Sequence, residues 1–267
     1  MILLKYIKQN IEYIVFFALV TMVAILILNR SLESFYNEQN GINSLDAIIY
    51  INLENRGDRK DVLMQDLEKL NTNMNKVHKV SGVFIPKNGH KGCIQSHILA
   101  LNMIKLNKWK RVLILEDDAQ LNMHPEIVND VLKKTMDTLD NNYSNWDVIM
   151  LGTANKVLDD KNNISYDINV STHDGTDKET LQIQKLKTAT TSSAYIVKDI
   201  YVDNILDLFN TCNNNMKHNK LTGDNYEFWA LDQKWAELQV KDNWFVLDKD
   251  PIKQRDIWST IMKESHG

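Results

Sequence analysis

The sequence predicts an α/β domain with a mostly parallel central sheet, preceded by one transmembrane helix. Three observations support this prediction: short, continuous apolar runs typical of buried strands, segments between them with apolar residues at helical spacing, and one long uncharged apolar run near the N-terminus. Alternating buried strands and helices favour a parallel sheet, in which ligands gather at the carboxyl ends of the strands.

The N-terminal apolar run extends from Tyr13 to Leu28 without a charge, close to the ~20 residues that usually span a bilayer. No small-residue cleavage pattern follows it, so we expect an uncleaved anchor and not a signal peptide. Lys5 and Lys8 precede the run and Arg30 alone follows closely, which favours a type II, single-pass arrangement with a luminal or otherwise non-cytoplasmic domain.

The chain therefore divides into four predicted parts. These are a cytoplasmic tail (1–10), a transmembrane anchor (11–29), a polar stem (30–44) and a single large domain (45–267).

Within the large domain, the elements follow from hydrophobic periodicity. We expect strands at Ala47–Leu53, Val77–Phe84, Val112–Leu115 and Asp147–Leu151, and helices at Asp58–Leu70 and Cys93–Leu106. Residues 152–182 are poor in apolar side chains, so they are expected to form a long surface excursion. A binding site is expected after Leu53, Leu115 and Leu151, where three strands end.

Charge and cysteine content exclude some classes of protein. With 31 Lys plus Arg against 35 Asp plus Glu, the formal net charge is −4, so no positive field favours nucleic acid as a partner. Cys93 and Cys212 are too few for a disulfide scaffold or a four-thiolate zinc site, although one disulfide between them is possible.

Three acidic residues, Glu116, Asp117 and Asp118, follow the apolar strand Val112–Leu115. In an extended chain Glu116 and Asp118 point to the same side, because side chains alternate along a strand. Carboxylates of this kind hold Mg²⁺ or Mn²⁺ together with substrate phosphates. A solvated acidic turn is the alternative, and the acidic residues alone do not decide between the two.

Arg56 and Arg59 lie at the junction between the first strand and the first helix of the domain. A guanidinium pairs well with phosphate, and a helix N-terminus favours an anion, so a diphosphate would fit there. The alternative is a helix capped by Asp58 with both arginines facing water.

Cys93 and His97 are four residues apart on a predicted helix and share one of its faces. A Cys/His nucleophile pair is conceivable. No activating partner is evident, so a buried cysteine beside a hydrogen-bonded core histidine is the preferred interpretation.

Asp232 is the candidate general base. Phe228, Leu231, Trp235 and Leu238 recur at helical spacing and predict a helix over Glu227–Leu238. Aromatic neighbours on that helix would raise the pKa of Asp232 by desolvation, which suits proton abstraction near neutral pH. The alternatives are an ordinary exposed Asp, or Asp224 or Glu227 as the base.

Six motifs in order, IIYINLENRGDR, GCIQSH, VLILEDD, DVIMLG, SSAYIV and PIKQRDIWST, resemble glycosyltransferase family 25 over residues 46–262. That family includes lipopolysaccharide galactosyltransferases and collagen β-galactosyltransferases. The resemblance implies a GT-A type nucleotide-binding fold, a UDP-sugar donor, usually UDP-galactose, a Mn (or Mg) ion, and inversion at the anomeric carbon.

The resemblance also implies roles for individual residues. Glu116 and Asp118 would hold the metal, and Asp232 matches an Asp that family members tend to carry in this region. The residues expected near the nucleotide-sugar are Asn52, Leu53, Arg56, Arg59, Gly92, Ser96, His97, Asp117 and Gln254. Lys91 departs from the family, which usually has an acidic residue there, and the N-terminal anchor is not a general family feature.

The sequence thus predicts an inverting glycosyltransferase that moves a sugar, galactose, from a UDP-sugar to a hydroxyl acceptor on a glycan or protein. One rival is a catalytically inactive sugar-binding or scaffold homologue with the same fold. A second rival is a metal-dependent nucleotidyltransferase or phosphohydrolase that uses the same acidic residues.

Overall fold

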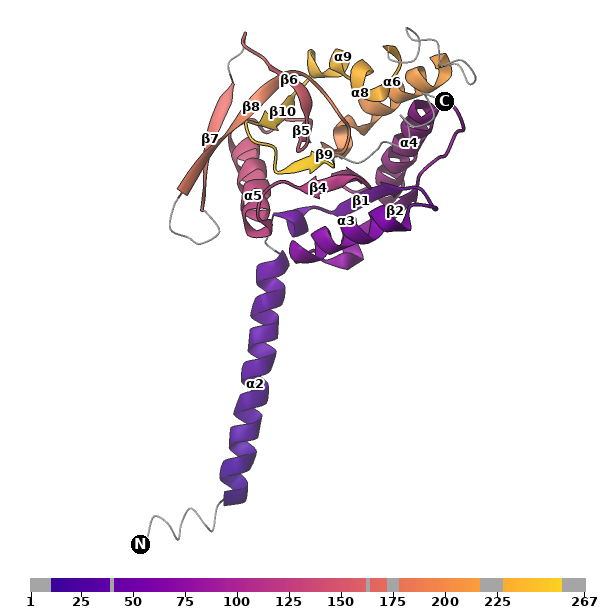
Figure 1. The fold of residues 1–267 in the computed structure, drawn as a ribbon. Coiled ribbons are helices and arrows are strands. Elements are labelled where there is room, and N and C mark those ends of the chain that lie inside the picture. Colours follow the sequence, from indigo (N-terminus) through magenta and orange to yellow (C-terminus); the bar gives the residue numbers. More distant parts are fainter. Residues whose placement is uncertain (1–10, 39–40, 162–163, 172–177, 217–227, 256–267) are drawn as a thin grey trace. The chain divides into compact units, whose positions relative to one another are not determined.

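The computed structural model describes residues 11–38, 41–161, 164–171, 178–216 and 228–255. The chain forms two compact units, Met1–Asn40 and Gly41–Gly267. Figure 1 shows the described helices and strands of both units, coloured along the sequence.

The first unit contains the helix α2 (Ile11–Glu38), which includes the predicted anchor. The helix continues through Arg30, where the predicted stem begins, because neither Gly nor Pro interrupts residues 29–38. In the part of the chain that the structure describes, no helix is long and apolar enough to cross a bilayer, so the predicted transmembrane anchor is not supported.

The second unit is built on a mixed sheet that confirms the α/β prediction. Its strands lie in the order β2 (Val77–Ser81), β1 (Ala47–Asn52), β3 (Arg111–Glu116), β9 (Ala194–Lys198), β5 (Val148–Met150), β10 (Trp244–Leu247), β8 (Lys178–Thr190) and β6 (Ala154–Leu158). The strands β2, β1, β3, β5 and β10 share one direction, and β9 runs antiparallel between β3 and β5. Their carboxyl ends therefore meet at one edge of the sheet.

Two antiparallel additions complete the strands described. β7 (Ser165–Ser171) pairs with β8, and β4 (Ala119–Leu121) pairs with β11 (Ile252–Gln254) in a separate small sheet. The second pairing brings Gln254 close to the segment that follows β3.

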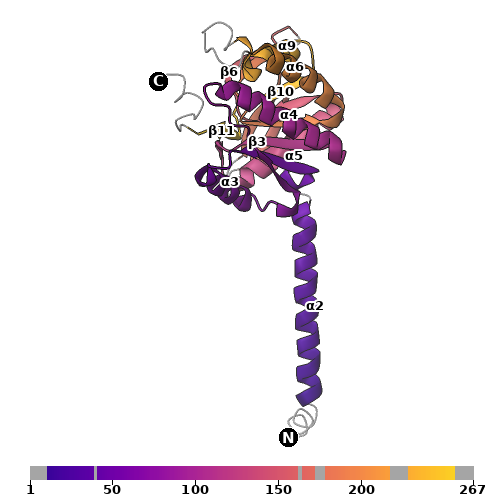
Figure 2. The same cartoon turned by 90° about the vertical axis from the view of Figure 1, so that its right-hand side faces the viewer.

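Helices cover both faces of the central sheet (Figure 2). The helices α3 (Gly57–Lys69) and α5 (Pro125–Asn142) pack on one face, and α4 (Gly89–Asn107), α6 (Val202–Asn215) and α8 (Leu231–Lys234) pack on the other, with α9 (Ala236–Gln239) beside β8. Short 3-10 turns are present at Ile42–Ser44, Met74–Lys76 and Asp199–Tyr201.

The strand β1 shows why the buried strands are uninterrupted apolar runs. All six of its residues are buried; Ile48 and Tyr50 belong to the core under α3 and α5, and Ile49 and Ile51 belong to the core under α4 and α6. A strand covered on both faces needs apolar side chains on both.

The start of α4, which leads into the pocket described below, is set by local chemistry. The side chain of Asn88 accepts a hydrogen bond from the backbone N–H of Lys91 at 3.0 Å, a standard N-cap contact. The helix ends at Lys108, whose φ of 58° is left-handed.

The predicted surface excursion over residues 152–182 is wrong. That segment contains β6, β7 and the start of β8, and its residues Ile168, Val170 and Leu181 are buried in the core beside α5. The sequence signal for the strand β7 is an alternation of exposed and buried side chains with a period of two residues. The many polar side chains on the outer face of β7 obscured this alternation.

The predicted helix over Glu227–Leu238 is also wrong as a single element. The described part forms two four-residue helices, α8 and α9, and Ala230 just before α8 is extended, with ψ of 136°. Trp235 is fully buried, and its indole N–H donates to the carbonyl of Ala189 at 3.0 Å, so this segment is held by tertiary contacts. Glu227 and Asp224 lie outside the described residues.

Candidate active site

A pocket opens at the carboxyl ends of β1, β2 and β3. The sequence predicted that the ends of β1 and β3 contribute to the binding site. Part of its lining is apolar and part is polar. The lining residues are Ile51, Leu53, Arg59, Gly82, Val83, Phe84, Ile85, Gly89, Cys93, Ser96, His97, Glu116, Asp117, Asp118 and Gln254. The loop after Leu151 does not contribute to this lining.

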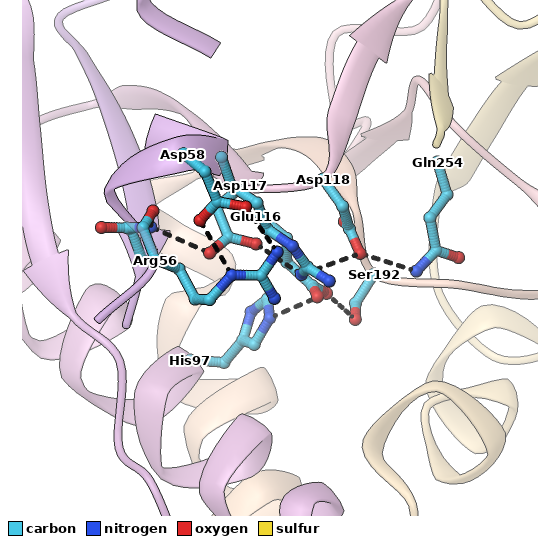
Figure 3. A network of polar contacts seen from close by, with 10 residues as sticks. Arg56, Asp58, His97, Glu116, Asp117, Asp118, Ser192 and Gln254 are labelled. Atoms are coloured by element: carbon cyan, nitrogen blue, oxygen red, sulfur yellow. Dashed lines mark hydrogen bonds and ion pairs between the residues drawn. The ribbon is translucent and has the colours of Figure 1, made fainter. Parts of the chain in front are cut away.

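Asp117 cross-links three elements beneath the pocket. Its Oδ1 accepts from Arg59 Nη1 at 3.0 Å and its Oδ2 accepts from Asn52 Nδ2 at 2.9 Å, so both carboxylate oxygens are used (Figure 3). The same Asn52 amide donates to the carbonyl of Arg56 at 2.9 Å. The predicted residues Asn52, Arg59 and Asp117 therefore lie together, as a fixed support for the acids on either side.

Asp118 keeps one oxygen for a ligand. Its Oδ2 accepts from Gln254 Nε2 at 3.1 Å, whereas its Oδ1 is buried and has no hydrogen-bond partner among the described residues. Burial, and then the charge of Glu116, raise the pKa of Asp118 to about 7. A buried carboxylate oxygen without a partner is costly unless a cation or donor compensates it.

Glu116 is held in place by two residues behind it. Its Oε1 accepts a hydrogen bond from the Ser192 hydroxyl and lies 3.4 Å from His97 Nε2. Burial opposes ionisation, but the hydrogen bonds from His97 and Ser192 outweigh it and lower the pKa of Glu116. Glu116 is therefore a carboxylate at neutral pH.

His97 is completely buried and connects Glu116 to Tyr195. Its Nδ1 lies 3.0 Å from the Tyr195 hydroxyl, and burial raises the pKa of that hydroxyl well above its ordinary value. The tyrosine stays protonated and orients the imidazole ring, so that Nε2 faces Glu116.

Gly92 and Ser96 shape the pocket wall. A Cβ on Gly92 would lie 2.3 Å from the carbonyl oxygen of Val83, so only glycine lets α4 approach the segment after β2 this closely. The Ser96 hydroxyl accepts from the N–H of Val83 at 2.8 Å and donates to the carbonyl of Gly92 at 2.7 Å.

Cys93 lines the pocket, one helical turn before His97. Burial and the charge of Glu116 raise the pKa of its thiol well above the ordinary value, which disfavours a thiolate nucleophile. Cys93 and Cys212 are both free thiols, so the possible disulfide is not formed.

Arg56 lies outside the pocket lining. Its guanidinium donates to both carboxylate oxygens of Asp58 at 2.9 Å, and this contact lowers the pKa of Asp58 to about 2. Asp58 does not cap α3, whose N-cap is Arg56. Lys91 also points elsewhere: its Nζ donates to the carbonyls of Asn213 and Met216 at the end of α6.

Asp232 lies near the pocket without lining it. Its Oδ2 accepts from the N–H of Thr191 at 3.2 Å, next to the Ser192 that binds Glu116. Its charge also contributes to raising the pKa of the Cys93 thiol in the pocket wall.

The oxygen ligands at the end of β3 fit a hard divalent cation. Glu116 and Asp118 offer carboxylates on the pocket wall, and Asp118 Oδ1 has no other partner among the described residues. Mg²⁺ and Mn²⁺ take such ligands, with phosphate oxygens completing the coordination.

Sequence reasoning gave no role to Ser192, Tyr195 or the wall residues Val83–Ile85. The SSAYIV motif was the available signal, because it begins the antiparallel strand β9. An antiparallel strand brings its first residues, and not its last, to the edge where β3 ends.

The sequence pattern of glycosyltransferase family 25 (LPS biosynthesis protein) matches residues 86–222. No curated protein matches the chain.

Solved structures match the chain at low sequence identity and low TM-score. A glycosyltransferase involved in the glycosylation of the major capsid of PBCV-1 has 10% identity and a TM-score of 0.42, covering 82% of this chain and 97% of the other. A197 from STIV has 10% identity and a TM-score of 0.40, covering 80% and 87%. A mannose-1-phosphate geranyltransferase from Thermus thermophilus has 9% identity and a TM-score of 0.39, covering 80% and 75%.

The matched segment spans about half of the chain. It contains the helix α4 and the acidic end of β3, which line the pocket, and the Ser192–Tyr195 segment that contacts Glu116 and His97. The protein is thus a member of glycosyltransferase family 25.

Proposed function

We propose that the protein is a metal-dependent, inverting glycosyltransferase that transfers galactose from UDP-galactose to a hydroxyl of a glycan or protein acceptor. Family membership supports the transferase class. The donor, the sugar and the metal are inferred from the chemistry of the pocket and from the family resemblance.

The observation that carries the proposal is the unpartnered Oδ1 of Asp118, buried among the described residues at the pocket wall beside Glu116. Asp117 does not compete for a ligand, since Arg59 and Asn52 use both of its oxygens. A divalent cation held by Glu116 and Asp118 would supply positive charge to the diphosphate that leaves with the nucleotide.

The apolar and the polar part of the pocket lining suit the two ends of a nucleotide-sugar. Leu53, Val83 and Phe84 offer an apolar surface for a flat base. Arg59 and Gln254, on the polar side, are placed to donate hydrogen bonds to phosphate or sugar oxygens.

Asp232 is proposed as the base that takes the proton from the acceptor hydroxyl as its oxygen attacks the anomeric carbon. The contact with Thr191 keeps its carboxylate beside the segment that holds Glu116. Attack from the face opposite the leaving diphosphate gives inversion.

The test is a turnover assay with UDP-galactose and Mn²⁺, in which both released UDP and the transferred sugar are measured. Turnover should disappear with EDTA and return with Mn²⁺, and Asp118→Asn should lower it at least about 100-fold. Asp137→Asn, on the exposed face of α5, is the matched control and should behave as wild type.

Each rival predicts a different result. Release of UMP or sugar phosphate without transfer would indicate nucleotidyl or phosphohydrolase chemistry. Donor binding without any turnover would indicate an inactive homologue. Full activity in Asp118→Asn, or activity that resists EDTA, would contradict the metal assignment. Repeating the assay with other UDP-sugars tests the choice of galactose.

A further inference from the structure

Cys93, His97 and Glu116 bring three kinds of metal-binding atom together in the pocket wall. The thiol sulfur, an imidazole nitrogen and a carboxylate oxygen all lie within 4.8 Å of one another. We propose that these residues form a site for Zn²⁺, or a cation of the same class, which shares Glu116 with the proposed Mn²⁺ or Mg²⁺ position at Asp118.

The ligand atoms select the class of cation. Sulfur, nitrogen and oxygen ligands together are typical of Zn²⁺, whereas Mg²⁺ and Mn²⁺ favour sites made of oxygen alone. Cys93 and His97 lie one turn apart on the same face of α4, and Glu116 reaches them from the end of β3. The site therefore needs no new arrangement of elements.

One distance is compatible with tetrahedral coordination. His97 Nε2 and Glu116 Oε1 are 3.4 Å apart, longer than a usual N–H···O hydrogen bond of about 2.7–3.2 Å. Bonds of about 2.0–2.1 Å from Zn²⁺ to nitrogen and oxygen, at a tetrahedral angle, hold the two atoms about 3.4 Å apart. The Cys93 Sγ lies within 4.8 Å of both of these atoms.

The surrounding residues already orient these ligands. The Tyr195 hydroxyl lies 3.0 Å from His97 Nδ1, which leaves Nε2 facing Glu116, and the Ser192 hydroxyl donates to Glu116. Such outer contacts fix the ring and the carboxylate at metal sites. All three ligands line the pocket, so a water or substrate atom can take the fourth position.

The consequence for activity follows from a shared ligand. Glu116 belongs to both proposed positions, so Zn²⁺ bound to Cys93 and His97 withdraws it from the cation at Asp118. Zn²⁺ should therefore inhibit Mn²⁺-dependent transfer. This consequence rests on the proposed function, whereas the zinc site itself does not.

The test uses the full-length protein, reduced and stripped of metal, and titrated with Co²⁺ as a spectroscopic substitute for Zn²⁺. A single equivalent should produce a thiolate-to-cobalt absorption band, which Zn²⁺ then removes. Cys93→Ser should lose the band and weaken Zn²⁺ binding at least about 100-fold. Cys212→Ser is the matched control, because this second cysteine is buried in α6 away from the pocket, and it should keep both properties.

Absence of the band in the wild type, or its persistence in Cys93→Ser, would overturn the proposal. If Cys93→Ser does not fold, alkylation of the wild type decides: Zn²⁺, but not Mg²⁺, should slow modification of Cys93 at least about 10-fold. Equal rates with both cations would also overturn it. A protein that binds Co²⁺ in this way yet transfers no sugar would refute the proposed function and leave the zinc site standing.

Discussion

At the scale of single residues, the three consecutive acids differ because their neighbours differ. Asp117 is neutralised by Arg59, Glu116 is held by Ser192 and His97, and Asp118 retains an oxygen without a partner among the described residues. The sequence identified all three as site residues. It could not assign these separate roles, because each partner comes from a distant part of the chain.

The raised pKa of Asp118 predicts a specific dependence of stability on pH. Its folded pKa of about 7 exceeds the ordinary value of 3.8, so between these values the folded state binds more protons than the unfolded state. Its contribution therefore makes the free energy of unfolding fall as the pH rises from about 4 to about 7, by about 1.4 kcal/mol per pKa unit at most.

Thermal melts at pH 5 and pH 8 measure this effect. Asp118→Asn should lose less stability between the two pH values than the wild type. Mn²⁺ binds the carboxylate form, so it should raise the melting temperature of the wild type more at pH 8 than at pH 5, and should barely affect Asp118→Asn. An identical decline in both proteins would show that Asp118 is not the group responsible.

Asp232 carries a separate prediction about catalysis. If it is the base, Asp232→Asn should lower turnover at saturating donor and acceptor about 100-fold, with UDP and Mn²⁺ binding kept. Steady-state kinetics with titration calorimetry for UDP separate the two effects. Turnover within a few-fold of wild type would move the base to another residue, with Asp224 next.

At the scale of elements, the close contact between α4 and the segment Val83–Ile85 maintains the pocket. Gly92→Ala places a methyl group 2.3 Å from the Val83 carbonyl oxygen, so the helix or the wall must move. We expect a loss of roughly 1–3 kcal/mol in the free energy of unfolding, together with weaker donor binding. Chemical denaturation and UDP titration measure the two.

Gly57→Ala provides the matched control for this prediction. Gly57 is also a helical glycine, at the start of α3, but an added Cβ there meets nothing within 4 Å. Its substitution should be neutral or stabilise by up to about 1 kcal/mol. Equal effects at the two positions would show that the contact with Val83 is unimportant.

At the scale of the whole molecule, the second compact unit begins at Gly41, four residues before the predicted domain start at residue 45. Ile42 and Leu45 are almost completely buried, and the side chain of Asn129 accepts from the N–H of Ile42 at 3.1 Å. Asn43 exchanges hydrogen bonds with Asn71 and Asn73. Residues 41–44, assigned to the stem from their polarity, therefore belong to the domain.

Two truncations test this boundary. The fragment 41–267 should fold and bind UDP within about 2-fold of the full chain, because it keeps these contacts. The fragment 46–267 loses two buried apolar side chains, worth about 1.5–3 kcal/mol each, and should melt at a clearly lower temperature. Equal melting temperatures would show that residues 41–45 do not contribute to the core.

The local sequence pattern by itself determined the strands β1, β3 and β5, the helices α3 and α4, and the acidic end of β3. A strand covered on both faces must be a continuous apolar run, and a packed helix must carry apolar residues at helical spacing. The ordered motifs likewise determined the family. Only the tertiary structure decided that β6, β7 and the start of β8 form within residues 152–182, that Trp235 divides the predicted helix, and that Ser192 and Tyr195 reach Glu116 and His97. These features depend on contacts between residues far apart in the chain, and short-range periodicity does not record such contacts.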